Sequence, residues 1–393
     1  MQLMGSVWQC ARCADVRCRT AQGDYVTSLR SGKAQNRWEG AALKEPLTSR
    51  DDHRYVIVGA GAIGGTVGAV LTRAGAPTIL VARGRHAEVL ATAGMTLRTP
   101  DGTFHTPVTA ASGTEQVWLT DRDVLVFATK TQQLDSALQE WVDQPVHGPD
   151  GVVGTAGERL PAMTALNGVA AEEKALRYFR RVFGICVWLP AVHLEPGEVI
   201  VRSWPVAGQF HIARWPASIS TPDDATLLSE VAETLTAAGI TVQIPHDVAP
   251  WKYNKLLSNL GNAAGALAAE AADIGAVVAA VRGEGEDVLR SAGIEFISFE
   301  TSTAARADGP TIRPIPGWNA AASNSTWQSL SRNTGNVETD FFNGEIVRLA
   351  HRHGMTAPLN AALARAARDA VRNASGPSGY SAAELAELLE VGH

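Results

Sequence analysis

The sequence contains little that would point to a membrane, to nucleic acid or to secretion. None of its apolar runs reaches the about 18 residues that a membrane-spanning helix needs. The formal net charge of −6 gives no overall basic field for nucleic acid. The N-terminal stretch lacks the apolar core of a secretory signal. We therefore expect a cytoplasmic globular protein with neither a membrane nor a nucleic acid as its partner.

Cysteine is also scarce, with four residues in the chain, three of them near the N-terminus. Cys10 and Cys13 form a CxxC pair, which can hold zinc, but no second pair follows and no fourth ligand is evident beyond Cys18. We expect no metal site. Residues 1–52 show no sustained helical or strand period, so we expect them to form a mostly disordered N-terminal extension.

Structured chain is predicted to begin near residue 53 as an α/β domain. The run RYVIVGAG is a short continuous apolar strand, GGTVGAVLTRAG a helix and PTILVARG the next strand, which together make a βαβ unit. RDVLVFATK and MTALNGV read as further buried strands, while EVIVRSW and QFHIARW alternate like an antiparallel pair. From about residue 247 the pattern becomes helical. We predict a Rossmann domain over 53–246 and an all-helical substrate and catalytic domain over 247–393.

The glycines at 59, 61 and 64 follow a buried strand and open a helix, as in a dinucleotide-binding loop. Gly59 allows the tight turn, Gly61 lets the backbone approach a diphosphate, and Gly64 permits close packing of helix on strand. The helix start at Ala62 and Ile63 then offers free N–H groups to the anion. The alternative is an ordinary flexible turn.

The end of the second strand is predicted to select the cofactor. NAD-binding proteins usually carry an acid there for the ribose 2′-hydroxyl, and this chain has none. Arg83, followed by Arg85, could instead pair with the 2′-phosphate of NADP. We therefore favour NADPH/NADP, against the alternative of two solvated loop charges.

Several polar residues are predicted to line a cleft. Lys130 and Asn167 follow apolar strands, at the sheet edge where ligands bind in open α/β folds. In WKYNKLLSNLGN, Lys255, Asn259 and Asn262 have the i, i+4, i+7 spacing of one helical face, where a desolvated lysine could act as an acid. The alternative for the helix is an exposed polar face. The alternative for Lys130 is an ordinary surface lysine, and the alternative for Asn167 is a common Asn-Gly turn.

Later in the chain, Thr326 and Glu338 are further candidates. Glu338 begins a predicted helix after the breaker RNTGN, and an acid is favoured in any first helical turn. Thr326 could equally be a surface residue within a helix.

Taken together, these motifs resemble the ketopantoate reductase (2-dehydropantoate 2-reductase) family over residues 54 to about 375. The motifs are GAGAIGG at 59–65, KTQQ at 130–133, NGV at 167–169, PG at 196–197, KLLSN at 255–259 and STWQSL with VETDFFNG within 325–344. The resemblance implies a Rossmann domain, a helical domain of the 6-phosphogluconate dehydrogenase C-terminal type, and an active site between them. It further implies reduction of ketopantoate to pantoate by NADPH, in pantothenate and coenzyme A biosynthesis.

The resemblance also implies roles for individual residues. Lys255 matches the family's catalytic lysine and Asn259 its substrate asparagine. Glu338 matches the family's acidic residue near the substrate and the catalytic lysine. Thr326 stands where the family has a substrate-binding serine. Cofactor-side or cleft positions are matched by Lys130, Gln133 and Asn167.

The sequence departs from the family pattern near the substrate. Asn262 lies seven residues after Lys255 instead of eight and is not followed by proline, Thr326 replaces serine, and an insertion of about HGPDGVVGTAGERLP precedes NGV. These departures leave open a relative that reduces a different 2-oxo acid or ketone. A non-catalytic NADP sensor is less favoured, because Lys255 and Glu338 are both retained. The expected partner is a small 2-oxo acid, and a homodimer stays open.

Overall fold

The computed structural model describes residues 15–20, 23–28, 53–269, 274–318, 324–331 and 337–389. Within a separate N-terminal unit, β1 (Asp15–Thr20) and β2 (Gly23–Ser28) form an antiparallel hairpin. The remainder of the expected disordered extension lies outside the described residues. So do Cys10 and Cys13 of the CxxC pair.

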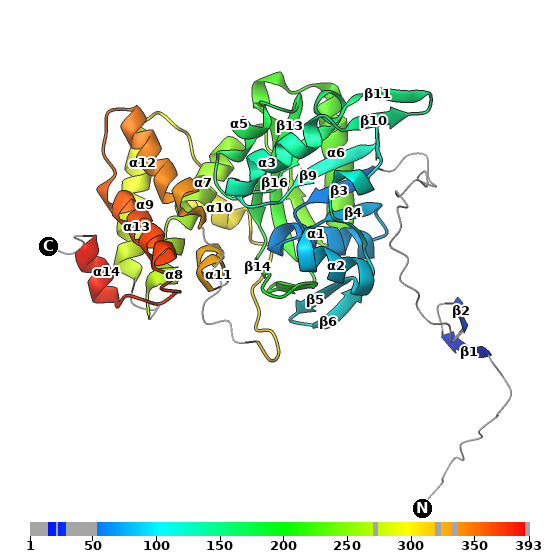
Figure 1. Cartoon of the computed structure of the whole chain (residues 1–393). Coiled ribbons are helices and arrows are strands. Elements are labelled where there is room, and N and C mark those ends of the chain that lie inside the picture. Colours follow the sequence, from blue (N-terminus) through cyan, green and yellow to red (C-terminus); the bar gives the residue numbers. More distant parts are fainter. Residues whose placement is uncertain are drawn as a thin grey trace, which may run out of the picture. The chain divides into compact units, whose positions relative to one another are not determined.

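The first half of the larger unit is built on an eight-stranded sheet that is almost wholly parallel (Figure 1). The central strands are buried along their whole length because helices cover both faces, which explains their continuous apolar sequence. In spatial order the strands are β17 (Ile240–Gln243), β16 (Gly208–Trp215), β13 (Arg181–Trp188), β12 (Pro161–Thr164), β9 (Asp123–Phe127), β3 (Arg54–Val58), β4 (Thr78–Val81) and β7 (Thr109–Ala111). The sheet confirms the predicted Rossmann-type fold.

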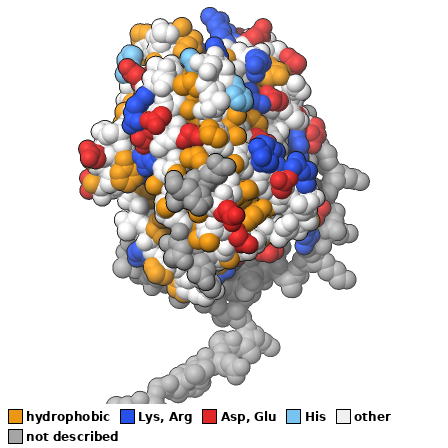
Figure 2. Space-filling view, turned by 90° about the vertical axis from the view of Figure 1, so that its left-hand side faces the viewer, with side chains coloured by type: hydrophobic (Ala, Val, Ile, Leu, Met, Phe, Trp, Pro, Cys, Tyr) orange, Lys and Arg blue, Asp and Glu red, His pale blue; other side chains and the backbone are white. Residues whose placement is uncertain are grey.

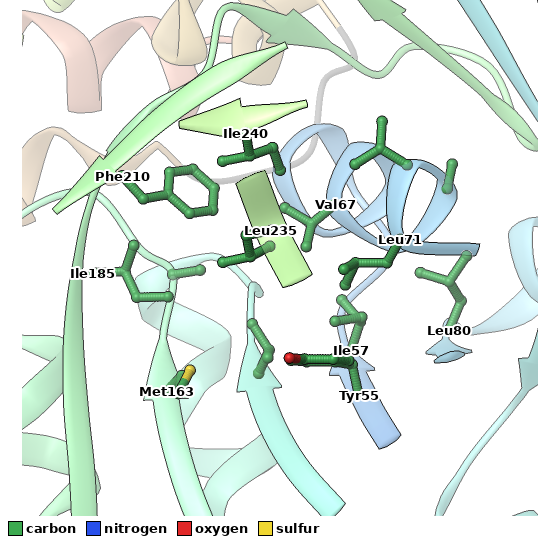
Figure 3. Packing of buried hydrophobic residues seen from close by; sticks show 14 of the residues in the cluster. Tyr55, Ile57, Val67, Leu71, Leu80, Met163, Ile185, Phe210, Leu235 and Ile240 are labelled. Atoms are coloured by element: carbon green, nitrogen blue, oxygen red, sulfur yellow. The ribbon is translucent and has the colours of Figure 1, made fainter. Parts of the chain in front are cut away.

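Two hydrophobic clusters fix the helices of this half to the sheet. Figure 3 shows one of them, in which Val67 and Leu71 of the first helix and Leu235 of the sixth meet sheet residues such as Ile57 and Phe210. The cluster on the other face includes Leu134, Leu138 and Trp141. The helices are α1 (Ala62–Arg73), α2 (Gly84–Ala93), α3 (Thr131–Val142), α4 (Ala156–Arg159), α5 (Ala171–Ala175) and α6 (Pro222–Ala237), with short 3₁₀ turns η1 (Thr114–Gln116) and η2 (Ala217–Ile219).

A smaller sheet corrects one sequence prediction. Its order is β14 (Ala191–Val192), β15 (Glu198–Val201), β5 (Met95–Thr99) and β6 (Gly102–Thr106). EVIVRSW supplies β15, which runs parallel to β5, whereas QFHIARW supplies β16 in the large sheet, antiparallel to β13. The predicted pairing of these two segments with each other is therefore wrong. Alternation identifies each segment as a strand but does not specify its neighbour. The antiparallel neighbour of β16 is β13, which was not predicted, and the parallel neighbour of β15 is the distant strand β5.

The predicted insertion before NGV folds locally. It contains most of the hairpin of β10 (Pro145–Gly148) and β11 (Gly151–Thr155), which joins β8 (Leu119–Thr120) in a third small sheet. Trp118 stacks on His147 beside this hairpin, with ring centroids 3.6 Å apart.

The second half consists of helices around a core of its own, as predicted. The elements are α7 (Ala249–Asn259), α8 (Asn262–Leu267), α9 (Gly275–Ser291), α10 (Phe299–Ala304), α11 (Ser325–Ser331), η4 (Glu338–Phe341), α12 (Asn343–Arg352), α13 (Pro358–Arg372) and α14 (Ala382–Leu388). Figure 2 shows one face of the molecule, with acidic and basic side chains interspersed among apolar ones. None of the helices in the described part of the chain is long and apolar enough to cross a membrane. The domain boundary at residue 246 stays a prediction.

Candidate active site

One cavity of about 480 Å³ is lined by residues from both halves of the larger unit. It combines glycine-loop residues, residues at the carboxyl ends of strands, and residues of the helical half. Of the predicted site residues it is lined by Gly59, Gly61, Ala62, Ile63, Lys130, Gln133, Asn167, Lys255, Asn259, Asn262 and Glu338. The structure thus brings together most of the positions that the sequence singled out, from segments nearly 280 residues apart.

The glycine loop has the geometry that the sequence predicted for its turn. Gly59 has φ +103°, a conformation that side-chain-bearing residues rarely adopt. A Cβ on Gly64 would lie 2.1 Å from the Gly59 carbonyl oxygen, so helix α1 can approach β3 only because this residue is glycine. A Cβ on Gly61 would meet nothing within 4 Å, because this backbone faces the cavity.

Helix α1 begins without any side chain that would satisfy its first N–H groups. Gly61 is its N-cap, no side-chain cap is present, and no acid stands in the first turn. The partial positive charge of this helix start is therefore offered to the cavity. This is the arrangement that accommodates a diphosphate.

The helix that carries Lys255 is shorter than predicted. The sequence places Asn262 on the same helical face as Lys255 and Asn259, but α7 ends at Asn259 and Asn262 is the first residue of α8. Between the two helices the Leu260 N–H donates to the Leu257 carbonyl at 3.4 Å, closing a tighter turn than the α-helical one, and Gly261 lies where a Cβ would meet the Val278 side chain of α9 at 2.9 Å. The prediction that one helix carries all three residues is therefore wrong. Lys255, Asn259 and Asn262 nevertheless all line the cavity, as the sequence predicted.

Asn259 is buried, yet its amide nitrogen Nδ2 has no hydrogen-bond partner among the described residues. Its Oδ1 accepts a long bond of 3.5 Å from Asn262 Nδ2. A buried, unpaired donor is costly, and such groups often await a ligand. Asn259 therefore presents an N–H donor at the wall of the cavity.

Lys255 and Lys252, three residues apart, occupy different environments. Lys252 is fully buried, where it pairs with Glu172 at 2.5 Å and donates to the Leu166 carbonyl at 3.2 Å. Lys255 forms no ion pair with a carboxylate of the described residues, and its Nζ lies 3.6 Å from the ring centroid of Trp188. Burial lowers the pKa of Lys255 to about 8. Lys252 therefore belongs to the supporting structure, and Lys255 is the lysine whose proton can be released near neutral pH.

Three hydrogen bonds join the start of α3 to the helical half beside the cavity. Glu338 Oε1 accepts from both the backbone N–H and the hydroxyl of Thr131, each at 3.0 Å. Lys130 Nζ donates to Ser329 Oγ at 2.5 Å. Glu338 thus caps a helix that begins on the opposite half, which its position in the sequence did not reveal.

Three predicted site residues do not line the cavity. Gly64 is buried beneath the loop and acts through packing. Arg83 is the N-cap of α2, its side chain is 69% exposed, and it pairs with Glu140 of α3. Thr326 is buried in α11, and its hydroxyl has no hydrogen-bond partner among the described residues.

Other residues line the cavity that were not predicted from the sequence, notably His193, Arg202 and Asn324. Asn324 precedes α11 and accepts from the Trp327 N–H at 2.9 Å, as a helix-capping asparagine would. Arg202 follows directly after the apolar strand β15, so the strand-end rule applied to Lys130 could have found it.

Comparisons with known proteins find relatives of both halves of the larger unit. Family models described as "Ketopantoate reductase PanE/ApbA" and its C-terminal counterpart match residues 55–216 and 247–370. The 2-dehydropantoate 2-reductase of Pyrococcus horikoshii is 26% identical over 317 residues, which cover 78% of this chain and 94% of that protein. That of Archaeoglobus fulgidus is 24% identical over 320 residues, covering 79% and 95%.

Solved structures of similar fold include a PanE/ApbA family ketopantoate reductase from Ralstonia eutropha, with a TM-score of 0.60, 23% identity, and coverage of 82% of this chain and 99% of that one. D-mandelate dehydrogenase in complex with NADH and anilino(oxo)acetate has a TM-score of 0.64 at 17% identity, with the same coverage. At these identities the likeness concerns the fold. With both family models matched in order along most of the chain, the protein belongs to the PanE/ApbA ketopantoate reductase family.

Proposed function

We propose that this protein is an NADPH-dependent reductase of a 2-oxo acid, with ketopantoate as substrate and pantoate as product. The observation that carries the proposal is one cavity lined by the glycine loop together with Lys255, Asn259 and Glu338. Family membership and relatives named 2-dehydropantoate 2-reductase support the same assignment. The product would enter pantothenate and coenzyme A biosynthesis.

The residues present fit a dinucleotide. The uncapped start of α1 and the open space before Gly61 suit a diphosphate, because its oxygens can approach backbone N–H groups there without meeting a side chain. A reduced nicotinamide, when bound, supplies the hydride. Lys130, Gln133 and Asn167 line the same cavity and would hold the ribose or the nicotinamide side.

Lys255 would act as the proton donor. Hydride addition to a ketone carbon places negative charge on the carbonyl oxygen, and a nearby ammonium both stabilises that charge and protonates the oxygen. With its pKa lowered to about 8 by burial, Lys255 is still largely charged at pH 7 but gives up its proton more readily than an ordinary lysine. The amine then recovers a proton from solvent.

Asn259 and Glu338 would orient the substrate. The unpaired Nδ2 of Asn259 can donate to a carboxylate or carbonyl oxygen of the substrate. The two hydrogen bonds from Thr131 to Glu338 both end on Oε1, which holds the carboxylate in place while Oε2 could accept from a substrate hydroxyl. Asn262 would also contact the substrate, in the role of the asparagine that the family has one residue later.

The second candidate is a reductase of a different 2-oxo acid. It is favoured by a specific observation: Thr326, which replaces the family's substrate serine, does not line the cavity, whereas Asn324, His193 and Arg202 do. A substrate that differs from ketopantoate in size or charge would meet these side chains.

The decisive assay follows NADPH oxidation with ketopantoate for the wild type and for Lys255→Ala. We expect the substitution to lower kcat by about 10²- to 10⁴-fold, the range for loss of a general acid. Lys174→Ala is the matched control, because Lys174 pairs with Asp135 away from the cavity lining. Equal rates for the wild type and Lys255→Ala would overturn the assigned role.

A panel of 2-oxo acids should be assayed with NADPH in parallel. Turnover of another 2-oxo acid far above that of ketopantoate would support the second candidate. Binding of NADPH without turnover of any ketone would instead indicate a non-catalytic sensor.

A further inference from the structure

Two cations share one tryptophan ring beside the candidate active site. Trp188 is the last residue of β13. Lys255 Nζ lies 3.6 Å from its ring centroid, and the guanidinium carbon of Arg306 lies 3.5 Å from it. The neighbours of Trp188 along the chain, Val187 and Leu189, both line the cavity.

The two cations must lie on opposite faces of the ring. An atom at such a distance from the centroid is nearly above the ring centre, because an atom beside the ring edge would be farther away. Two groups at that height over the same face would overlap. Trp188 therefore separates Lys255 and Arg306 by about 7 Å, with the indole between them.

Arg306 is held in this position by its own segment. It follows α10, and its Nε donates to the carbonyl oxygen of Ser302 at 3.0 Å. No ion pair joins Arg306 to a carboxylate of the described residues. Its charge is therefore not neutralised locally and acts on its surroundings.

The other titratable groups around Lys255 add little negative charge. Burial raises the pKa of the Cys186 thiol to about 11, so the thiol is neutral near pH 8. Burial lowers the pKa of His211, the cross-strand partner of Cys186, to about 4, so it is neutral as well. Lys252 and Glu172 neutralise each other, and Glu338 lies on the cavity side. Arg306 is the uncompensated charge among them.

We propose that Arg306 is a positioning residue that acts through the ring of Trp188 and makes Lys255 a stronger proton donor. The proposal rests on the proposed function, because it concerns the residue that would protonate the substrate. A second cation competes for the electron-rich ring that stabilises the Lys255 ammonium and repels that ammonium across the indole. In agreement, burial is the main cause that lowers the pKa of Lys255, Cys186 acts in the opposite direction, and the Arg306 charge lowers the pKa further.

The test measures Lys255 directly, without cofactor or substrate. The rate at which acetic anhydride acylates Lys255 is followed by mass spectrometry between pH 6 and 10, since only the free amine reacts. For Arg306→Met we expect the curve to move to higher pH and the rate at pH 8 to fall about threefold. Arg306→Gln, which can still form a hydrogen bond, should do the same if the methionine variant fails to fold.

Two controls separate charge from structure. Arg306→Lys keeps the cation and should retain the wild-type curve. Arg282→Met removes an arginine that lies over Phe299 of α10 but does not face Lys255, and it should also leave the curve unchanged. Coinciding curves for Arg306→Met and the wild type, or an equal displacement in Arg306→Lys, would overturn the proposal.

Turnover distinguishes this inference from the proposed function. If Lys255 is the proton donor, the alkaline limb of the kcat profile should move to higher pH in Arg306→Met together with the acylation curve. A displaced acylation curve in a protein that reduces no 2-oxo acid would retain the role of Arg306 and overturn the proposed reductase.

Discussion

Arg83 stands at the end of β4, where a dinucleotide-binding fold distinguishes NADP from NAD. In the structure its guanidinium pairs with Glu140, so a 2′-phosphate would have to compete with that carboxylate. Both side chains are at least partly exposed, so the pair itself adds little stability and exchange of partner is inexpensive.

We therefore expect Arg83→Ala to raise the KM for NADPH about tenfold, as loss of one charge-assisted phosphate contact would. Glu140→Gln should lower the KM for NADPH, because it leaves Arg83 free for the phosphate. The KM for NADH, measured on the same variants, is the internal control and should change little. A parallel rise for both cofactors would contradict phosphate recognition by Arg83.

At the scale of single residues, sequence reasoning recovered Lys255 and Glu338 but not their partners. Lys255 could be recognised from KLLSN, whereas its contact with Trp188 depends on β13, a strand that was not predicted. Arg306 lies in a segment without any recognisable motif. Thr131, which Glu338 caps, is more than 200 residues distant, and such pairing follows from tertiary packing that no local pattern encodes.

At the scale of elements, the glycine loop offers a matched pair of substitutions. Gly61→Ala should change the free energy of unfolding by no more than about 1 kcal/mol, since the added Cβ meets nothing within 4 Å. It should weaken NADPH binding, because the methyl group enters the space that a diphosphate would use. Gly64→Ala should destabilise the protein by about 3 kcal/mol or more, since its Cβ would lie 2.1 Å from a backbone oxygen.

Chemical denaturation and NADPH titration of both variants check this prediction. Normal stability and normal NADPH affinity in Gly61→Ala would show that the cavity before α1 is not the diphosphate site. Equal stability of the two alanine variants would contradict the packing role of Gly64.

Element prediction succeeded where the local pattern and the tertiary environment agree. Strands β3, β4 and β9 are short apolar runs with buried surroundings on both faces, and each was found. The pairing of β15 and β16 was missed because alternation identifies a strand but not its neighbour. The break between α7 and α8 falls at Leu260 and Gly261, whose backbone angles stay in the helical region, so the local pattern did not reveal it.

At the scale of the whole molecule, a buried histidine links stability to pH. His211 is fully buried on β16 and stacks on Trp251, with centroids 3.8 Å apart. Burial lowers its pKa from 6.5 to about 4. Above pH 6.5 the imidazole is neutral in both the folded and the unfolded chain. Between pH 6.5 and 4 the unfolded chain takes up a proton that the folded chain does not, so stability falls as the pH falls.

This difference amounts to about 3 kcal/mol in the free energy of unfolding between pH 6.5 and 4. We expect His211→Phe, which keeps a ring against Trp251, to lose most of that pH dependence. Urea denaturation at several pH values measures it. His351→Gln, on an exposed position of α12, is the control and should retain the wild-type slope. An unchanged slope in His211→Phe would contradict the assignment.

The contacts made by Lys130 and Thr131 have a consequence for binding as a whole. These adjacent residues begin α3 in the sheet half and reach Ser329 and Glu338 in the helical half, and two of the four line the cavity. The dinucleotide and the oxo acid would thus both contact this group of residues. A shift of these residues on binding of the first ligand would then change the affinity for the second. Thermodynamic reciprocity then requires the same factor in the other order of binding. We therefore expect the two ligands to bind cooperatively through the first turn of α3.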